Sequence, residues 1–334
     1  MKEALYYQKK DNGLLECNLC AHNCQISEGN YGICKSRKNI DSKLFSENYG
    51  KICSIASDPI EKKPLYHYHS GKYILSIGSV ACNMKCDFCQ NWEISQSNVN
   101  EYFYLRKYQP QQIVDKAKLT KNNIGIAYTY NEPTIWYEFM LDTAKIATEN
   151  GLKNVMVTNG YINPKPLKEL CNFIDAFNVD LKSFDSSFYL KISKAKLQPI
   201  LENLKTIKKR NKHLELTNLV IPSVNDNVNV FEEMMKWIAN ELGEKTVLHI
   251  SRYFPRYKMT AAPTPVSKLL ELYNIAKQYL NYVYLGNVSL SEGNDTFCKS
   301  CGKLVIIRRD YLTKIIGISE NGSCSTCGTN VITN

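Results

Sequence analysis

The chain has 334 residues, of which 44% are hydrophobic, and a formal net charge of +10 at pH 7. This length can bury a large core and is enough for one barrel-sized domain with smaller attachments. No window approaches the ~18 uncharged apolar residues of a membrane span, and the first ten residues have no apolar core like that of a signal peptide. We therefore expect a globular protein of the cytoplasm that does not engage a membrane.

Thirteen cysteines are present, and most of them fall into three clusters with metal-ligand spacing. Disulfides explain these cysteines poorly, because the chain is long and carries no export signal. Metal binding in a reducing compartment explains them better. The clusters divide the chain into a cysteine-rich head, a long middle and a cysteine-rich tail.

The head is expected as an extension over residues 1–69, and its four cysteines have the spacing C-x2-C-x3-C-x9-C: Cys17, Cys20, Cys24 and Cys34. Four thiolates can close a tetrahedral zinc site or hold a [4Fe–4S] cluster. The spacing does not separate these two occupants. Because all four thiolates would bind the metal and leave no open position for a substrate, we expect a structural or electron-relaying site, with zinc slightly favoured.

The second cluster follows a strand-like segment at residues 73–77 and has the spacing C-x3-C-x2-C: Cys82, Cys86 and Cys89. Three thiolates can hold three irons of a [4Fe–4S] cube and leave the fourth iron free to bind something else. A zinc site would need a fourth protein ligand, and the nearest unassigned cysteines lie far away in the sequence. With the aromatic Phe88 before the last cysteine, the pattern resembles the signature of the radical S-adenosylmethionine (SAM) enzymes.

That resemblance implies a [4Fe–4S] cluster whose open iron chelates the amino and carboxylate groups of SAM. The cluster would pass one electron to the sulfonium, which breaks to methionine and a 5′-deoxyadenosyl radical able to take a hydrogen atom. Radical chemistry of this kind belongs to the cofactor, while the protein supplies position and shielding.

The middle of the chain, expected as one domain over residues 70–292, alternates strand-like and helix-like segments. Strands are predicted at residues 73–77, 124–130, 154–157, 176–181, 214–221, 247–250 and 282–285. Apolar residues at three- and four-residue intervals predict helices at residues 111–119, 134–150, 166–173, 199–210, 230–242 and 267–280. This alternation favours parallel pairing and an α/β barrel or open barrel.

Polar motifs follow several of these strands, at the carboxyl ends where the loops of such barrels build the active site. The motifs are Asn131-Glu132-Pro133, Thr158-Asn159-Gly160, Asp180 with Lys182, and His249 with Ser251 and Arg252. Taken singly, each is an ordinary turn, helix start or core residue. Because these motifs occur together with a cysteine loop, we expect all of them to face one active-site opening at the carboxyl ends of the strands.

Longer matching stretches make the resemblance more specific. They include residues 77–96, 130–134, 157–161, 180–184, 249–253 and 284–287. Together they resemble the radical SAM enzyme of the AmmeMemoRadiSam system, a relative of pyruvate formate-lyase activating enzyme, along nearly the whole chain. The resemblance implies an α/β fold with a radical SAM partial (β/α)6 barrel.

The same resemblance implies a set of SAM-binding residues. In the activating enzymes the motif matching Asn131-Glu132-Pro133 contacts the SAM amino group, and the positions matching Asp180, Lys182 and His249 line the SAM site. The full set expected here is Phe88, Asn131, Glu132, Thr158, Asn159, Asp180, Lys182 and His249. One departure is that the activating enzymes usually have Gly-Gly-Glu-Pro, whereas Tyr130 and Asn131 stand in place of the glycines.

The tail, expected over residues 293–334, carries two C-x-x-C-G knuckles that bracket a β-rich stretch at residues 304–318: Cys298 with Cys301, and Cys324 with Cys327. Paired knuckles of this kind predict a zinc ribbon. Such a ribbon can bind nucleic acid, but it is more often a structural or docking module when no aromatic and basic surface is evident.

Three functions are compatible with these patterns. The first is a radical SAM oxidoreductase that acts on a small molecule, with Memo-like and AMMECR-like proteins as partners and a ferredoxin or flavodoxin as electron donor. The second is an activating enzyme that installs a glycyl radical on a partner protein, although simple activating enzymes lack the two extra cysteine modules. The third is a metal-stabilised nucleic-acid-binding protein, which rests only on the ribbon and on a net charge that could equally attract an acidic electron donor.

Overall fold

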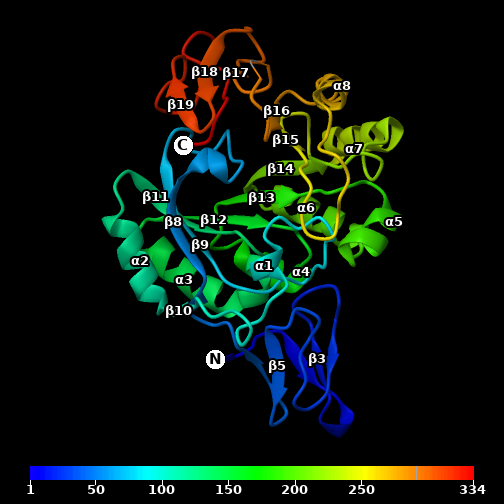
Figure 1. The fold of residues 1–334 in the computed structure, drawn as a ribbon. Helices are drawn as coiled ribbons and strands as arrows, with labels where there is room; N and C mark the ends of the chain where they lie inside the picture. The colour runs from blue at the N-terminus through cyan, green and yellow to red at the C-terminus, as the bar shows by residue number, and fades with distance from the viewer. Residues whose placement is uncertain (291) are drawn as a thin grey trace.

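A large, mostly parallel sheet forms the middle of the molecule. Small β units lie at the two ends of the molecule, one formed by the head and one by the tail (Figure 1). The computed structural model describes residues 1–290 and 292–334. The eight strands of the sheet lie in the order β16-β15-β14-β13-β12-β11-β9-β8. Their bounds are β8 (Ser54–Pro59), β9 (Tyr73–Gly78), β11 (Asn123–Tyr128), β12 (Lys153–Thr158), β13 (Ala176–Asp180), β14 (His213–Val220), β15 (Val247–Arg252) and β16 (Val283–Gly286).

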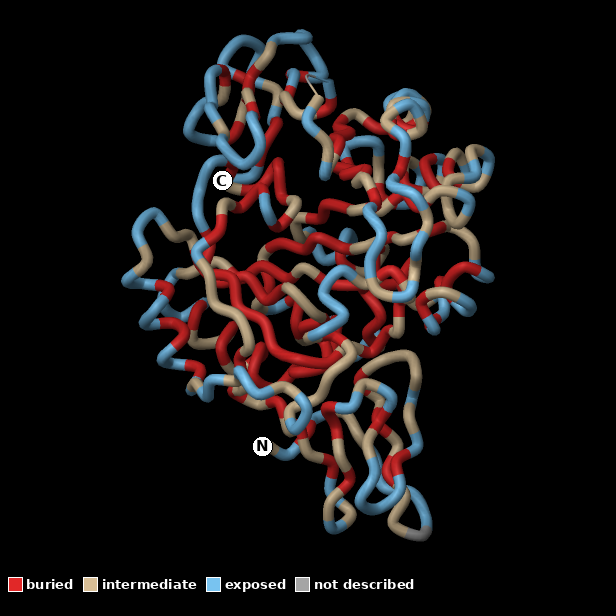
Figure 2. Tube along the Cα trace, in the orientation of Figure 1, coloured by how far each residue is buried: buried red, intermediate tan, exposed pale blue. Residues whose placement is uncertain are grey.

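Helices connect the parallel strands, as the periodicity predicts. They are α2 (Pro110–Leu119), η3 (Pro133–Trp136) leading into α3 (Tyr137–Glu149), α4 (Pro164–Leu170), α6 (Leu197–Lys209), α7 (Val228–Glu241) and α8 (Val266–Ala276). In α6 the buried apolar residues recur at three- and four-residue spacing, which gives the helix one face toward the sheet. Strands β9, β11 and β13 are almost entirely buried, as expected for a sheet covered on both faces, and Figure 2 shows this buried path through the middle.

The structure differs from the expected (β/α)6 barrel in two ways. Seven strands are parallel rather than the six that the resemblance implies, and the seventh, β16, is the strand predicted at residues 282–285, which pairs in parallel with β15. In addition, β8 pairs antiparallel with β9, so the main sheet begins at Ser54, inside the stretch expected as the head. The sequence of β8, Ser-Ile-Ala-Ser-Asp-Pro, has little alternation of apolar and polar residues, so periodicity does not reveal it. A short helix, α5 (Ser186–Phe188), and the π turn after it were likewise not predicted.

The head contains two small antiparallel sheets. One has the order β1 (Lys2–Glu3), β6 (Lys43–Ser46), β5 (Arg37–Ile40), and the other has the order β2 (Tyr7–Lys9), β3 (Leu15–Cys17), β4 (Gln25–Ile26). A pair formed by β7 (Lys51–Ile52) and β10 (Arg106–Lys107) follows. The tail is a three-stranded antiparallel unit, β17 (Thr296–Phe297), β18 (Leu304–Arg309) and β19 (Leu312–Ile315).

In the described part of the chain, no helix is long and apolar enough to cross a membrane.

A buried carboxylate joins the sheet to the segment that leads into β9. Glu215 on β14 is fully buried and accepts hydrogen bonds from the backbone N–H groups of Tyr66 at 2.9 Å and His67 at 2.7 Å. It also accepts from the imidazole Nε2 atoms of His213 at 2.9 Å and His249 at 2.7 Å. Although burial opposes ionisation, the two histidines hold the pKa of Glu215 well below its usual range.

The tail docks beside this network. The imidazole of His67 bonds through Nδ1 to the carbonyl oxygen of Val331 and through Nε2 to the hydroxyl of Tyr284, both at 2.6 Å. The guanidinium of Arg308 stacks over the Tyr66 ring at 4.3 Å and donates to the Tyr66 carbonyl oxygen at 2.7 Å. Thr333 donates its N–H to the His67 carbonyl oxygen at 2.8 Å. The tail is therefore joined to the main sheet by buried polar contacts as well as by apolar packing.

This network predicts that stability falls in mild acid. Burial lowers the pKa of His67 to about 4, so below about pH 6.5 the unfolded chain binds a proton that the folded chain excludes. The free energy of unfolding should then fall by up to about 1.4 kcal/mol per pH unit until the pH reaches the folded pKa. Urea titrations at pH 7 and pH 5 should show a smaller loss in His67→Gln than in the unmodified protein. An equal loss in both would contradict the assignment to His67.

Candidate active site and metal centres

The loop after β9 carries the second cysteine cluster to the carboxyl end of the sheet. Gly78, at the end of β9, lies so close to β11 that a Cβ there would come within 2.8 Å of the Thr129 carbonyl oxygen. The thiol of Cys82 accepts the N–H of Met84 at 3.3 Å, and the thiol of Cys89 lies 3.1 Å from the Ser95 hydroxyl. Together with Cys86, these two thiols line a cavity of about 430 Å³.

Glu132 connects the loops that follow β11 and β12. Its side chain is only 1% exposed, and its Oε1 accepts from the N–H of Thr134 at 2.9 Å and the hydroxyl of Thr158 at 2.7 Å. Its Oε2 accepts from the N–H of Asn159 at 2.8 Å. The Asn159 side chain donates in turn to Oδ1 of Asn83, beside Cys82, at 2.9 Å. Burial raises the pKa of Glu132, although these hydrogen bonds oppose the increase.

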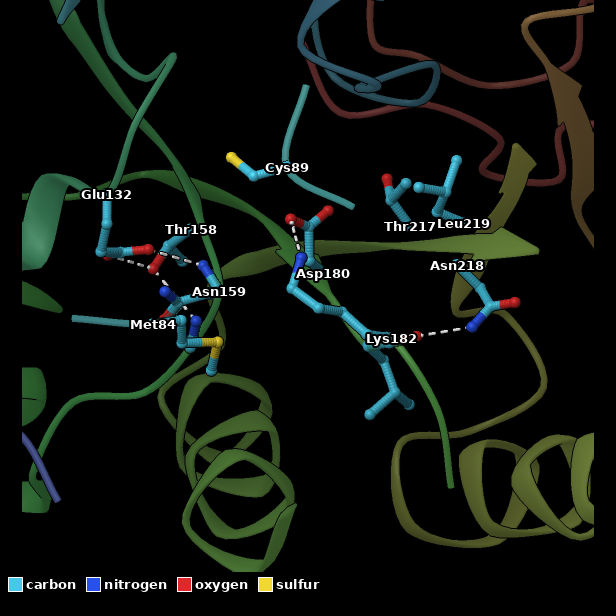
Figure 3. Close-up of polar contacts among 12 residues, drawn as sticks. Met84, Cys89, Glu132, Thr158, Asn159, Asp180, Lys182, Thr217, Asn218 and Leu219 are labelled. Atoms are coloured by element: carbon cyan, nitrogen blue, oxygen red, sulfur yellow. Dashed lines mark hydrogen bonds and ion pairs between the residues drawn. The ribbon is translucent and has the colours of Figure 1, made fainter. Parts of the chain in front are cut away.

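Asp180 and Lys182 form an ion pair at the end of β13, on the opposite side of the same space (Figure 3). Lys182 Nζ lies 2.8 Å from Asp180 Oδ2 and 5.7 Å from the centre of the Phe88 ring. Burial alone would lower the pKa of Lys182, but the charges of Asp180 and Cys86 raise it, so the lysine is a cation. The cavity therefore contains a fixed positive charge near the cysteines.

Seven of the eight predicted SAM-binding residues line the cavity that the three cysteines share: Phe88, Asn131, Glu132, Thr158, Asn159, Asp180 and Lys182. His249 does not line it. Its imidazole is held by Glu215 and faces a neighbouring cavity of about 710 Å³ that shares Lys62, Ser251 and Asn287 with the first. A part for His249 in SAM binding therefore stays a prediction.

Sequence reasoning missed a buried charged group on the rim of the cavity. Lys63 is 2% exposed and pairs with Asp58 of β8 at 2.7 Å, while its Nζ lies 4.7 Å from the centre of the Tyr130 ring. The Tyr130 hydroxyl also donates to Asp58 at 2.8 Å. The only sequence signal was the replacement of a glycine by Tyr130, and β8 itself was not recognised.

The tail cysteines form a compact four-thiol group. The ligand atoms of Cys298, Cys301, Cys324 and Cys327 all lie within 4.8 Å of one another. Cys298 Sγ is 3.5 Å from Cys327 Sγ, and Cys301 Sγ is 3.7 Å from Cys324 Sγ. A tetrahedral zinc ion with Zn–S distances of about 2.3 Å needs thiolates about 3.8 Å apart. The group could therefore bind a metal, and its spacing suits zinc.

The head cysteines lie on neighbouring loops. Cys17 ends β3 and donates its N–H to the Cys24 carbonyl oxygen at 2.8 Å. Burial raises the pKa of the Cys20 thiol, and the charges of Cys34, Cys17 and Cys24 raise it further. Among the described residues, the tail cysteines form the compact four-thiol group, and Cys82, Cys86 and Cys89 share one cavity. The metal site expected on the head cysteines stays a prediction.

Comparison with known proteins agrees with this site. The Radical SAM superfamily matches residues 76–238, which include the cysteine loop and both strand-end motifs around Glu132 and Asp180. An uncharacterized protein of Methanocaldococcus jannaschii is 45% identical over 331 residues, which cover 98% of each chain. The pyruvate formate-lyase-activating enzyme of Clostridium pasteurianum is 20% identical over 179 residues, covering 52% of this chain and 75% of that enzyme.

The fold also has a solved counterpart. The crystal structure of Streptococcus suis SuiB bound to S-adenosylmethionine superposes with a TM-score of 0.51 and 13% identity, covering 66% of this chain and 52% of that chain. At this identity the likeness concerns the fold alone. From the superfamily match and the mostly parallel eight-stranded sheet with a cysteine loop at its carboxyl end, the chain belongs to the radical SAM superfamily of enzymes.

Proposed function

We propose that the enzyme holds a [4Fe–4S] cluster on Cys82, Cys86 and Cys89, cleaves SAM reductively and acts on a small-molecule substrate. The observation that carries this proposal is the shared cavity, in which three thiols face a buried carboxylate and an ion pair. Cys82, Cys86 and Cys89 are the only cysteines among the described residues that line this cavity. A [4Fe–4S] cluster bound there would therefore have one iron without a cysteine ligand, free to bind another molecule. When bound, the cluster and SAM would supply a 5′-deoxyadenosyl radical that abstracts hydrogen.

The protein's own residues supply charge and position in this site. SAM carries an ammonium, a carboxylate and a sulfonium, and a cavity that buries them must provide partners for them. Glu132 and Asp180 offer carboxylate oxygens, while Asn131 and Asn159 offer amides at the same rim. The Phe88 ring is 5% exposed and lies beside the Lys182 ammonium, so it covers the lysine side of the ion pair.

The finer assignment is the AmmeMemoRadiSam system, with Memo-like and AMMECR-like proteins as partners and an acidic one-electron carrier as donor. Its support is the resemblance along nearly the whole chain. A glycyl-radical activating enzyme is the second candidate, supported by the likeness to the pyruvate formate-lyase-activating enzyme. Anaerobic incubation with SAM, reductant and deuterated cell extract separates these candidates. Deuterium in 5′-deoxyadenosine from the small-molecule fraction favours the first, and deuterium only from a protein fraction favours the second.

The first prediction from the proposed function is that Cys86→Ala abolishes SAM cleavage and leaves the protein folded. Two remaining thiolates would hold the cube poorly and would not leave one defined open iron. The measurements are bound iron and the yield of 5′-deoxyadenosine. Cys171→Ala removes a buried cysteine outside the three clusters and serves as the control. Normal SAM cleavage by Cys86→Ala would remove the central claim.

The second prediction concerns Glu132. In Glu132→Ala the charged amino acid portion of SAM would lose a carboxylate partner, and the donors that hold this carboxylate would lose their acceptor, so SAM binding should weaken by about 1–3 kcal/mol while the cluster survives. Calorimetry on the reconstituted variant tests this, with the exposed Glu149→Ala as the control. If SAM affinity is unchanged while the cluster is intact, Glu132 acts only at the start of the η3 helix.

The third prediction is that the tail binds about one zinc ion per chain, and that Cys324→Ala destabilises the protein more than it changes its chemistry. Structural zinc contributes folding free energy directly. Zinc content and the thermal midpoint of unfolding are the measurements, and the neighbouring exposed Ser325→Ala is the matched control. Iron at these four thiolates, or no zinc in the purified protein, would refute the assignment.

A further inference from the structure

We propose that the four head cysteines, Cys17, Cys20, Cys24 and Cys34, hold a second [4Fe–4S] cluster and not zinc. Its role as an electron relay rests on the function proposed above, but its presence does not. The sequence left zinc and iron open and slightly favoured zinc. Three structural features favour iron: the spacing of the thiols, a buried guanidinium beside them and their place against the cysteine loop of the active site.

The spacing of the thiols separates the head from the tail. The four tail thiols lie within 4.8 Å of one another, close enough for one ion to bind them all, whereas no three of the four head thiols, all of them described, are mutually that close. The same is true of Cys82, Cys86 and Cys89. A zinc ion draws its thiolates together around one atom, but a cube binds each thiolate to a different iron and so spreads them apart. Like the cysteine loop, the head therefore lacks the compact spacing of the tail.

The turns around the cysteines also differ between the head and the tail. In both tail knuckles a glycine with positive φ follows the second cysteine, Gly302 at 72° and Gly328 at 74°. The head has Ala21 at the corresponding position, and its positive φ values fall instead at Asn23 (46°), before Cys24, and at Lys35 (58°), after Cys34. The turns around the head cysteines therefore lack the glycine that follows the second cysteine of each tail knuckle.

A buried guanidinium lies against the head site. Arg37 is 1% exposed, and its Nη1 lies 3.8 Å from the thiol of Cys17 while it also donates to the Leu5 carbonyl oxygen at 2.8 Å. Its Nη2 pairs with Glu138 of α3, which fixes the head on the main domain. The Nε of Arg37 has no hydrogen-bond partner among the described residues. Donors placed beside cluster sulfurs are one of the means by which proteins set the reduction potential of a cluster.

The head site is joined directly to the loop proposed to hold the first cluster. The Nε2 atom of His22, two residues after Cys20, lies 2.7 Å from the carbonyl oxygen of Asn83, the residue next to Cys82. The His22 ring also packs edge-on against Tyr161 at 5.0 Å. A single side chain thus spans the two cysteine sets. Zinc has no redox chemistry, whereas a cube here could accept one electron from a reduced carrier protein and pass it to the first cluster.

The test removes the first site and asks whether iron remains. The unmodified, anaerobically reconstituted protein should hold about eight irons, and the triple variant Cys82→Ala/Cys86→Ala/Cys89→Ala about four. After dithionite reduction, the cluster of the triple variant should give an electron paramagnetic resonance signal that SAM does not change. The double variant Cys20→Ala/Cys24→Ala should lose about four irons and keep a SAM-sensitive signal. Cys171→Ala should match the unmodified protein.

Two results would overturn the proposal. One is a triple variant without iron whose zinc content is about two per chain, since zinc would then fill the head as well as the tail. The other is a triple variant that holds neither iron nor a second zinc. If the unmodified protein still cleaves SAM in either case, the proposed function stands while the second cluster falls. A triple variant with about four irons, combined with an unmodified protein that never cleaves SAM, would support the cluster and refute the function.

Discussion

The carboxylate of Glu132 is the interaction on which the geometry of the active site depends. Burying an ionised carboxylate is costly unless hydrogen bonds replace its water. Here three donors do so, and they come from two different strand-end loops. Through Asn159 and Asn83 the same network reaches the backbone beside Cys82. One side chain therefore fixes the positions of the loops after β9, β11 and β12 relative to one another.

The residue two positions before Glu132 shows how a strained backbone is stabilised. Tyr130 has a φ of +75°, a conformation that costs a residue with a side chain about 1–3 kcal/mol. Its hydroxyl bonds to Asp58, and the ammonium of Lys63 lies over its ring. Both partners come from β8 and the turn after it. The antiparallel strand therefore supports the loop at the position where the activating enzymes that this chain resembles usually have glycine.

Local patterns predicted much of the fold and site, because they depend on short stretches of sequence. Helical periodicity located α2, α6 and α7, and motifs at strand ends placed Glu132, Asp180 and Lys182 around one cavity. Contacts between distant segments could not be predicted in this way. The polar pattern of β8 gave no sign that Asp58 would face Tyr130, and the position of His249 after a strand gave no sign that Glu215 would hold its ring. The occupant of the head likewise depends on distances between loops, which cysteine spacing in sequence does not contain.

The docking of the tail has a practical consequence for preparing the protein. Arg308 and Val331 belong to the same small unit as the tail cysteines, yet they hold Tyr66 and His67, whose N–H groups bond to Glu215 inside the sheet. A metal bound by those cysteines is thus coupled to the interior of the catalytic domain. Chelators used to clear adventitious metal before iron–sulfur reconstitution would loosen this coupling. Preparations made in that way would lose stability for a reason that adding iron and sulfide does not repair, and resupplying the tail metal first would restore it.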